Sequence, residues 1–228
     1  MPTIRETFDR QIQKIENETL ILGSMVEQAM QHAIDALLTH DVPAARQIYE
    51  QDLLINEKRF SIENAILILI ATQQPLARDL RIIASILEIT TELERMGDYA
   101  KGIAKVVTKL QGVEIPIPEK KLNEMCDITI DMLHRGLQAF LDQDVNQARI
   151  IPLDDDKVDA LYNEIYHELV QMMIAKPENI DHANHLMWVA HNLERMADRV
   201  TNICERTVFI ATGELLEIST SDDEDMDF

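Results

Sequence analysis

The chain has 228 residues and a mass of 26.1 kDa, and its 21 Lys and Arg residues face 41 Asp and Glu residues, for a formal net charge of −20. This length is enough for one large domain or for two domains of about 110 residues, each with its own core. The negative charge argues against nucleic acid or anionic lipid as the main partner, because their phosphates would be repelled. Five acidic residues lie in segment 219–228, so the body of the chain still carries a net charge of −15.

Composition predicts helices and a reducing compartment. There are only six glycines, and aromatic residues make up 4% of the chain, which favours helix over sheet. Cys126 and Cys204 are too few for a disulfide framework and lack CxxC spacing. Segment 1–10 has no apolar stretch typical of a signal peptide, and the longest apolar run, 65–71, is far shorter than the roughly 20 residues that span a bilayer. We therefore expect a cytoplasmic protein without direct membrane insertion.

Proline residues divide the chain into long tracts in which apolar residues recur at helical spacing. The pattern predicts six helices, over residues 3–40, 43–71, 76–111, 119–142, 145–174 and 179–212. Pro152 falls inside the fifth tract and is expected to interrupt it. Trp188 and Cys204 lie on the apolar side of the sixth tract and are expected in the core.

The two halves of the sequence resemble each other. Segment 41–46 (Asp-Val-Pro-Ala-Ala-Arg) is repeated at 144–149 (Asp-Val-Asn-Gln-Ala-Arg), and segment 93–98 (Leu-Glu-Arg-Met-Gly-Asp) at 193–198 (Leu-Glu-Arg-Met-Ala-Asp). The offsets are 103 residues for the first segment and 100 for the second. The three residues by which they differ fall in the intervening loop, where length changes are tolerated. This duplication predicts an all-α fold of two similar antiparallel three-helix bundles. Their expected bounds are 1–112 and 113–218, followed by a disordered acidic tail at 219–228.

The repeated segment places two carboxylates one helical turn apart, Glu94 with Asp98 and Glu194 with Asp198. Like charges at this spacing cost a helix about a few tenths of a kcal/mol, so the pair does not stabilise the helix locally. A solvated face, with salt bridges to the neighbouring arginines, would explain a single pair. Its recurrence with the same flanking residues favours a cation site in each half.

A neighbouring helix in each half adds oxygen ligands at the same spacing. These are Asp52 and Asn56 in the first half, and Asp155 and Asp159 in the second. An all-oxygen donor set favours iron(III), manganese, magnesium, calcium or zinc bound through carboxylates, and disfavours a Cys-based site. Because Asn56 is uncharged, we expect the second site to bind a cation more tightly.

Three segments give the chain a resemblance to a known family: 74–81 (Gln-Pro-Leu-Ala-Arg-Asp-Leu-Arg), 93–100 and 191–198. With Thr212-Gly213-Glu214, they resemble the PhoU family from about residue 3 to residue 216. The resemblance implies two three-helix bundles whose E(D)xxxD motifs bind multinuclear iron or zinc clusters in some members of the family. Magnesium and manganese are further candidates from the oxygen donor set. It assigns metal binding to Glu94, Asp98, Glu194 and Asp198, and to Asp52, Asp155 and Asp159 in addition.

The resemblance also implies a function. PhoU proteins are regulators of phosphate uptake that silence the phosphate-starvation response. Their implied partners are the ATPase subunit of the phosphate ABC transporter and the phosphate-sensing histidine kinase, and we expect a homodimer without enzymatic activity. The alternative is a metal-storage or di-iron redox bundle. A ferritin-like centre needs two Glu-x-x-His motifs, and this sequence has one, from Glu164 to His167.

Overall fold

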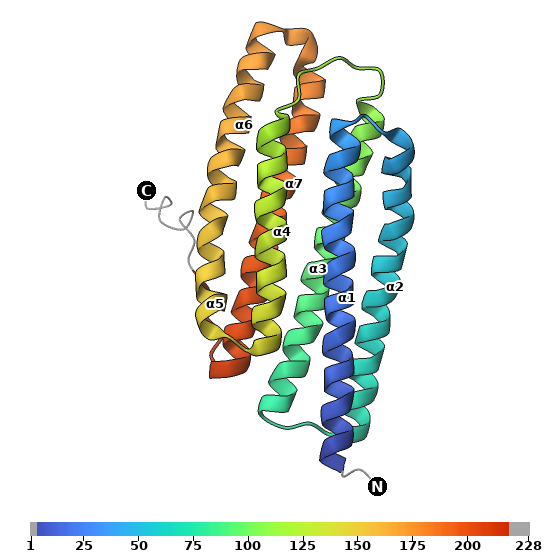
Figure 1. Ribbon diagram of the computed structural model, residues 1–228, viewed down its shortest axis with the longest axis vertical. Coiled ribbons are helices and arrows are strands. Elements are labelled where there is room, and N and C mark those ends of the chain that lie inside the picture. The colour runs from blue at the N-terminus through green and yellow to red at the C-terminus, as the bar shows by residue number, and fades with distance from the viewer. Residues whose placement is uncertain (1–3, 219–228) are drawn as a thin grey trace.

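The computed structural model describes residues 4–218, which form an all-helical fold (Figure 1). In chain order, its elements are α1 (Ile4–Leu38), α2 (Val42–Gln73), α3 (Arg78–Lys109), α4 (Glu119–Asp142), α5 (Val145–Ile150), the 3₁₀ helix η1 (Ile151–Asp154), α6 (Asp155–Ala175), the 3₁₀ helix η2 (Pro177–Asn179) and α7 (Ile180–Thr212). The predicted all-α class and six long helices are confirmed. The predicted acidic tail at 219–228 lies outside the described residues.

The fifth predicted helix is interrupted near its start, as Pro152 led us to expect. Helix α5 ends at Ile150, η1 carries the chain past the proline, and α6 begins at Asp155. Proline has no backbone N–H to donate into an α-helix and clashes with the preceding turn, so the segment tightens to 3₁₀ geometry. As a result Asp155 lies in the first turn of α6, where it is buried.

The first repeated segment is a helix start that occurs in both halves. His40 and Gln143 adopt left-handed backbone angles, with φ of 53° and 51°, and an aspartate follows each of them. Asp41 Oδ1 accepts a hydrogen bond from the N–H of Ala44 at 2.9 Å, and Asp144 Oδ1 accepts from two backbone N–H groups at 2.9 and 3.1 Å. Each aspartate satisfies backbone donors that the first helical turn leaves open. The two halves therefore share a local structure as well as a sequence pattern.

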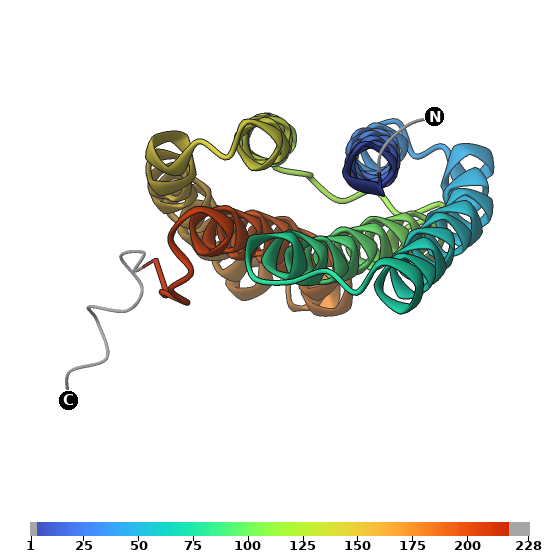
Figure 2. The ribbon, with the colours of Figure 1, turned by 90° about the horizontal axis from the view of Figure 1, so that it is seen from below.

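The helices form a curved layer with two helices on its inner side. Helices α2, α3, α7 and α6 lie next to one another in that order, and α1 and α4 cover the concave face (Figure 2). The most extensive packing joins α3 to α7, which run in opposite directions, so the two halves meet at the middle of the layer. Three seams result: α2 with α3, α3 with α7, and α7 with α6.

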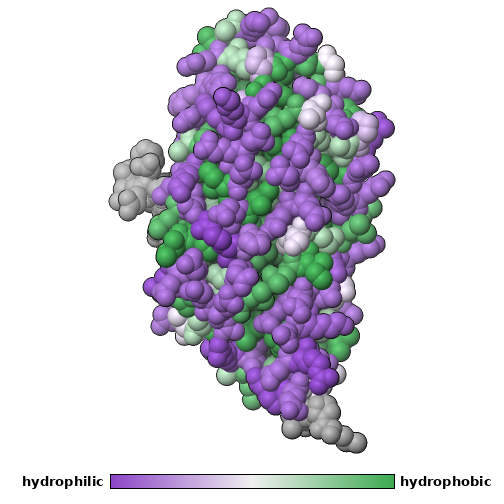
Figure 3. Space-filling view, in the orientation of Figure 1, coloured by the Kyte–Doolittle hydropathy of each residue, from purple (hydrophilic) through white to green (hydrophobic). Residues whose placement is uncertain are grey.

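The apolar stripes of α3 and α7 form the centre of the core. Leu93 and Met96 on α3, and Leu193 and Met196 on α7, are completely buried, as their spacing predicts. On the face that carries α1 and α4, hydrophilic side chains dominate, and hydrophobic ones emerge in narrow strips between them (Figure 3). Within residues 4–218, no helix combines the length and apolarity needed to cross a membrane.

The two cysteines provide a test of this packing. Cys126 and Cys204 are buried, and burial raises the pKa of each thiol to about 12. Such a pKa leaves roughly one thiol in ten thousand ionised at pH 8, and the thiolate is the reactive form. We expect neither cysteine to be alkylated by iodoacetamide in the native protein, and both to be alkylated in guanidinium chloride. Mass spectrometry of the two samples measures this, and rapid native labelling of either thiol would contradict the packing.

Candidate functional site

The predicted carboxylates lie at the two outer seams of the curved layer. Asp52 on α2 faces Glu94 and Asp98 on α3, and we call these three residues the first carboxylate cluster. The second carboxylate cluster consists of the counterparts on α6 and α7: Asp155, Asp159, Glu194 and Asp198. The repeat thus places an aspartate from one helix opposite the ExxxD pair of the next in each half.

In the first cluster a lysine lies between the two helices. The Asp52 side chain is only 3% exposed, and its Oδ2 accepts a hydrogen bond from Lys101 Nζ at 2.7 Å. The same Nζ lies 3.7 Å from Asp98 Oδ1. Asn56 Nδ2 adds a long hydrogen bond of 3.4 Å to Asp52 Oδ2. Because a buried carboxylate is costly without a charged partner, Lys101 is what stabilises Asp52 at this seam.

Glu94 is the carboxyl group of this cluster whose ionisation is hindered. Its side chain is 18% exposed, and Arg59 Nη1 lies 3.6 Å from its Oε1. Burial raises the pKa of Glu94, and the negative charges of Asp98 and Asp52 add to this effect against the opposing charge of Arg59. A carboxylate held beside like charges on a helix surface is typical of a site selected for binding rather than for stability.

The second cluster borders a cavity. Asp155, Asp198, Thr201 and Asn202 are among the residues that line a space of about 380 Å³. Thr201 is buried, and its Oγ1 has no hydrogen-bond partner among residues 4–218. Such an atom is a ready ligand for an ion or a water molecule. The geometry therefore brings Asp155 and Asp198 to one space, together with an oxygen that sequence reasoning missed.

Glu194 faces the other side of the second cluster. Its Oε2 lies 2.9 Å from His191 Nδ1, and the His191 ring is stacked at a tilt against Tyr162, with ring centroids 6.1 Å apart. Burial raises the pKa of the Tyr162 hydroxyl, and the negative charge of Glu194 raises it further. These contacts connect the cluster to a groove at the α3–α7 seam.

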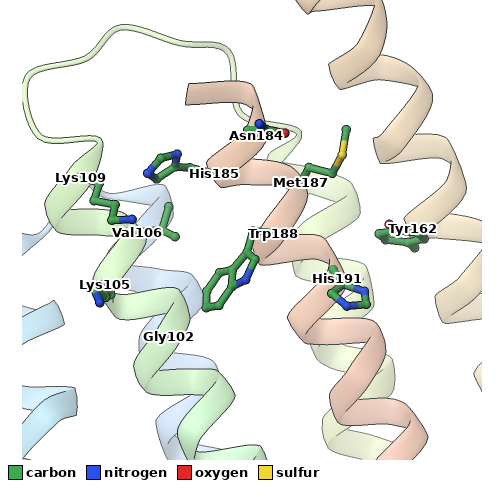
Figure 4. A pocket seen from close by; sticks show the side chains of 10 residues that line it. All are labelled: Gly102, Lys105, Val106, Lys109, Tyr162, Asn184, His185, Met187, Trp188 and His191. Carbon is green, nitrogen blue, oxygen red and sulfur yellow. The ribbon is translucent and has the colours of Figure 1, made fainter. Parts of the chain in front are cut away.

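That groove has a volume of about 600 Å³ (Figure 4). Its lining comprises Gly102, Lys105, Val106, Lys109, Tyr162, Asn184, His185, Met187, Trp188 and His191. The prediction that Trp188 lies in the core is wrong, because its side chain is 44% exposed and forms the floor of the groove. The indole lies against the α3 backbone at Gly102, where an added Cβ would come within 2.4 Å of Trp188 Cη2. Only a glycine on α3 allows this close approach.

Both carboxylate clusters fall within a recognised domain family. The sequence matches the PhoU domain over residues 19–107 and again over residues 122–207. The chain belongs to the PhoU family. It is 33% identical over 94% of its length, and 99% of the relative's, to the phosphate-specific transport system accessory protein PhoU homolog of Clostridium acetobutylicum. A further relative, 31% identical over 91% of this chain and 86% of its own, is the phosphate-specific transport system accessory protein PhoU of Escherichia coli.

Two solved PhoU structures have the same fold. The crystal structure of the phosphate transport system regulatory protein PhoU from Streptococcus pneumoniae superposes with a TM-score of 0.86 at 33% identity, covering 92% of this chain and 99% of that one. The crystal structure of PhoU from Pseudomonas aeruginosa gives a TM-score of 0.85 at 29% identity, covering 91% and 100%.

The metal clusters that PhoU membership implies fit the two halves of this chain differently. Within the described part of the chain, no three His, Cys, Asp or Glu side chains converge on one point at which they would hold an ion. In the first cluster the position between Asp52 and Asp98 is taken by the Lys101 ammonium, so the residues present do not fit a metal ion. In the second cluster, Asp155, Asp198 and the buried Thr201 hydroxyl border a cavity that Arg195 and Arg199 also line.

Lys101 is a second residue that the sequence did not indicate. It follows Asp98 by three residues, and the matching residue after Asp198 is Thr201. Extending the comparison of the two repeated segments by three residues would have revealed this difference. That it matters depends on the register of α2 against α3, which brings Asp52 to Lys101 and which the sequence does not show.

The raised pKa of Glu94 leads to a prediction about stability. The folded state binds the Glu94 proton more tightly than the unfolded chain, so the contribution of this group to stability is lost as pH rises through its pKa. Replacing Glu94 with Gln removes that loss and keeps an oxygen toward Arg59. We expect the variant to melt at a higher temperature than the wild type at pH 7. The difference should disappear at about pH 4, where Glu94 becomes protonated and, like Gln, carries no charge.

Thermal unfolding followed by circular dichroism at the two pH values measures this effect. Glu114→Gln, at an exposed position outside the helices, removes the same charge and should have little effect. A Glu94→Gln variant that is less stable than the wild type at pH 7 would show that the Arg59 contact outweighs burial.

Proposed function

We propose that this protein is a non-enzymatic accessory regulator of phosphate-specific transport that silences the phosphate-starvation response when phosphate is plentiful. It acts as a cytoplasmic homodimer that links the ATPase subunit of the phosphate ABC transporter to the phosphate-sensing histidine kinase. The observation that carries the proposal is the match to both PhoU domains, together with relatives of more than 30% identity over nearly the whole chain that are named as accessory proteins of this transport system. The C-terminal half, from 113 to 218, carries the metal-dependent part of this role.

An adaptor needs a surface for partners, and α2 carries a suitable one. Five large apolar side chains on its outer side are more than half exposed: Leu53, Leu54, Phe60, Leu67 and Ile68. Leu53, Phe60 and Leu67 recur every seven residues and so form one stripe along the helix. The matching positions for the first two on α6 are Asp156 and Asn163, which are polar. Glu57 and Asn64 lie between these side chains on the same face, and the exposed apolar row with polar residues interspersed supports binding of an amphipathic partner helix to the first half.

The metal proposal rests on the second carboxylate cluster. Asp155 and Asp198, joined by Asp159 and Glu194, would hold iron or zinc through oxygen ligands, with Thr201 as a further donor. Such an ion would supply positive charge that neutralises the α6–α7 seam and holds the two helices together. The role of the residues themselves is to bind and orient, because the oxygen-rich cluster contains no nucleophile paired with a base.

The alternative is a metal-storage or di-iron redox bundle. The Glu-x-x-His motif that favours it belongs to α6, and both Glu164 and His167 are exposed rather than directed into the bundle. An inward-facing motif is what a ferritin-like centre requires. Oxygen-dependent oxidation of iron(II) by the purified protein would support this alternative, and its absence would favour the regulator.

Deletion of the gene in the source organism tests the regulatory role. We expect deletion to derepress alkaline phosphatase in phosphate-rich medium, and the wild-type gene to restore repression. A Leu53→Ser/Phe60→Ser/Leu67→Ser variant should fold, because these side chains are exposed, but it should fail to restore repression and should lose the transporter ATPase in pull-down experiments. Ile174→Ser, which removes a 77% exposed apolar side chain from α6, is the matched control and should restore repression.

Unchanged phosphatase activity after deletion would contradict the regulatory role and favour the metal-storage alternative. If the triple variant represses as well as Ile174→Ser does, the regulator would stand and the α2 stripe would be excluded as its partner surface.

A further inference from the structure

The repeat allows each residue around one carboxylate cluster to be compared with its counterpart around the other. Three positions differ in the same sense. Lys101 corresponds to Thr201 at the offset of 100 residues, and Asn56 and Arg59 correspond to Asp159 and Tyr162 at the offset of 103. Two of the changes replace a cation of the first half with an uncharged hydroxyl residue in the second, and the third replaces a neutral amide with a carboxylate. All three make the surroundings of the second cluster more negative than those of the first.

Lys101 and Thr201 account for most of this difference. The Lys101 ammonium lies 2.7 Å from the buried Asp52 and 3.7 Å from Asp98, so one cation joins a carboxylate of α2 to a carboxylate of α3. The shorter Thr201 side chain leaves its own Oγ1 buried without a hydrogen-bond partner among the described residues. At that position the second half has a cavity instead, which Asp155 and Asp198 border together with the α7 residues Arg195 and Arg199.

Two cations that contact the second cluster, Arg195 and His191, differ in kind from Lys101. Arg195 Nη1 lies 3.0 Å from Asp198 Oδ2, but both side chains are substantially exposed, at 41% and 31%, and both belong to α7. His191 contacts Glu194 from the same helix, and its side chain is 49% exposed. Exposed pairs within one helix are weak and can rearrange, whereas Lys101 joins two helices through a buried carboxylate.

We propose that Lys101 is the built-in cation of the first carboxylate cluster and takes the position that a metal ion would occupy, so that only the second cluster binds metal. The metal site at the second cluster is the part of this proposal that rests on the proposed function, whereas the role of Lys101 does not depend on it. A divalent ion at the first cluster would have to displace the ammonium from Asp52, and it would then lie beside a positive charge. The protein is therefore asymmetric, with a metal-independent half and a metal-dependent half built on one repeat.

Exchanging the two residues tests this assignment. Purified full-length protein is stripped with chelator and dialysed against Zn²⁺, and bound zinc per chain is measured by plasma mass spectrometry. We expect the wild type to bind zinc and Asp155→Asn/Asp198→Asn to bind none. Lys101→Thr should bind more zinc per chain than the wild type does. Thr201→Lys should lose the zinc of the wild type. Lys105→Thr removes the same charge from an exposed position one turn further along α3 and should bind as the wild type does.

Thermal unfolding gives a second readout that does not depend on counting zinc. In chelator, Lys101→Thr should melt below Lys105→Thr, because Asp52 stays buried without its cation. Added Zn²⁺ should reverse this loss in Lys101→Thr. If Lys101→Thr does not fold without metal, recovery of the folded state with Zn²⁺ supports the proposal, and failure to recover overturns it.

The outcomes separate this inference from the metal site of the proposed function. Zinc retained by Asp155→Asn/Asp198→Asn would show that the first cluster binds despite Lys101, and the inference would be wrong. Zinc on the wild type without any gain in folded Lys101→Thr would also overturn it, while the second site stands. Zinc on Lys101→Thr alone would support the role of Lys101 and refute the second site. Zinc on neither protein would refute both.

Discussion

A buried carboxylate has to be compensated, and this fold places one at the same seam in each half. Asp52 and Asp155 are both 2% exposed, and each lies where a helix packs beside the ExxxD pair of its neighbour. Removing a carboxylate from water without a partner costs several kcal/mol, roughly half or more of what a domain typically has to spare. A seam whose buried aspartate is paired with a side-chain cation is a structural contact, whereas a seam that takes its positive charge from a bound ion is a binding site.

The rest of the architecture follows from the position of these seams. Packing of α3 against α7 places the two clusters on opposite sides of one rigid central pair. Arg199 Nη1 on α7 lies 3.2 Å from Glu92 Oε2 on α3, which adds a polar contact to the apolar core between the halves.

The sequence predicts those parts of the molecule that depend on local chemistry. Leu93 and Met96 lie on the buried stripe because helical spacing alone decides it. Pro152 interrupts the fifth helix for an equally local reason. The family resemblance, which rested on segments 74–81, 93–100 and 191–198 and on Thr212-Gly213-Glu214, is confirmed over both domains.

Features that depend on the register between helices were missed or wrong. The Lys101 contact with Asp52 spans 49 positions of sequence and requires α2 and α3 to pack at one register. Trp188 was assigned to the core from its helical face, but the missing side chain at Gly102 opens a groove in which the indole stays accessible. The carboxylates were identified as candidates from the repeat, and Asn56 already distinguished the two halves, but the contact that Lys101 makes with Asp52 was known only from the packing of α2 against α3.

The most direct test of the asymmetry is a crystal structure of the wild-type protein grown with Zn²⁺, with diffraction data collected on both sides of the zinc absorption edge. The account predicts an anomalous difference peak beside Asp155 and Asp198, with none beside Asp52, where the Lys101 ammonium should keep its contact. Peaks of similar height at both seams, with Lys101 turned away from Asp52, would contradict it.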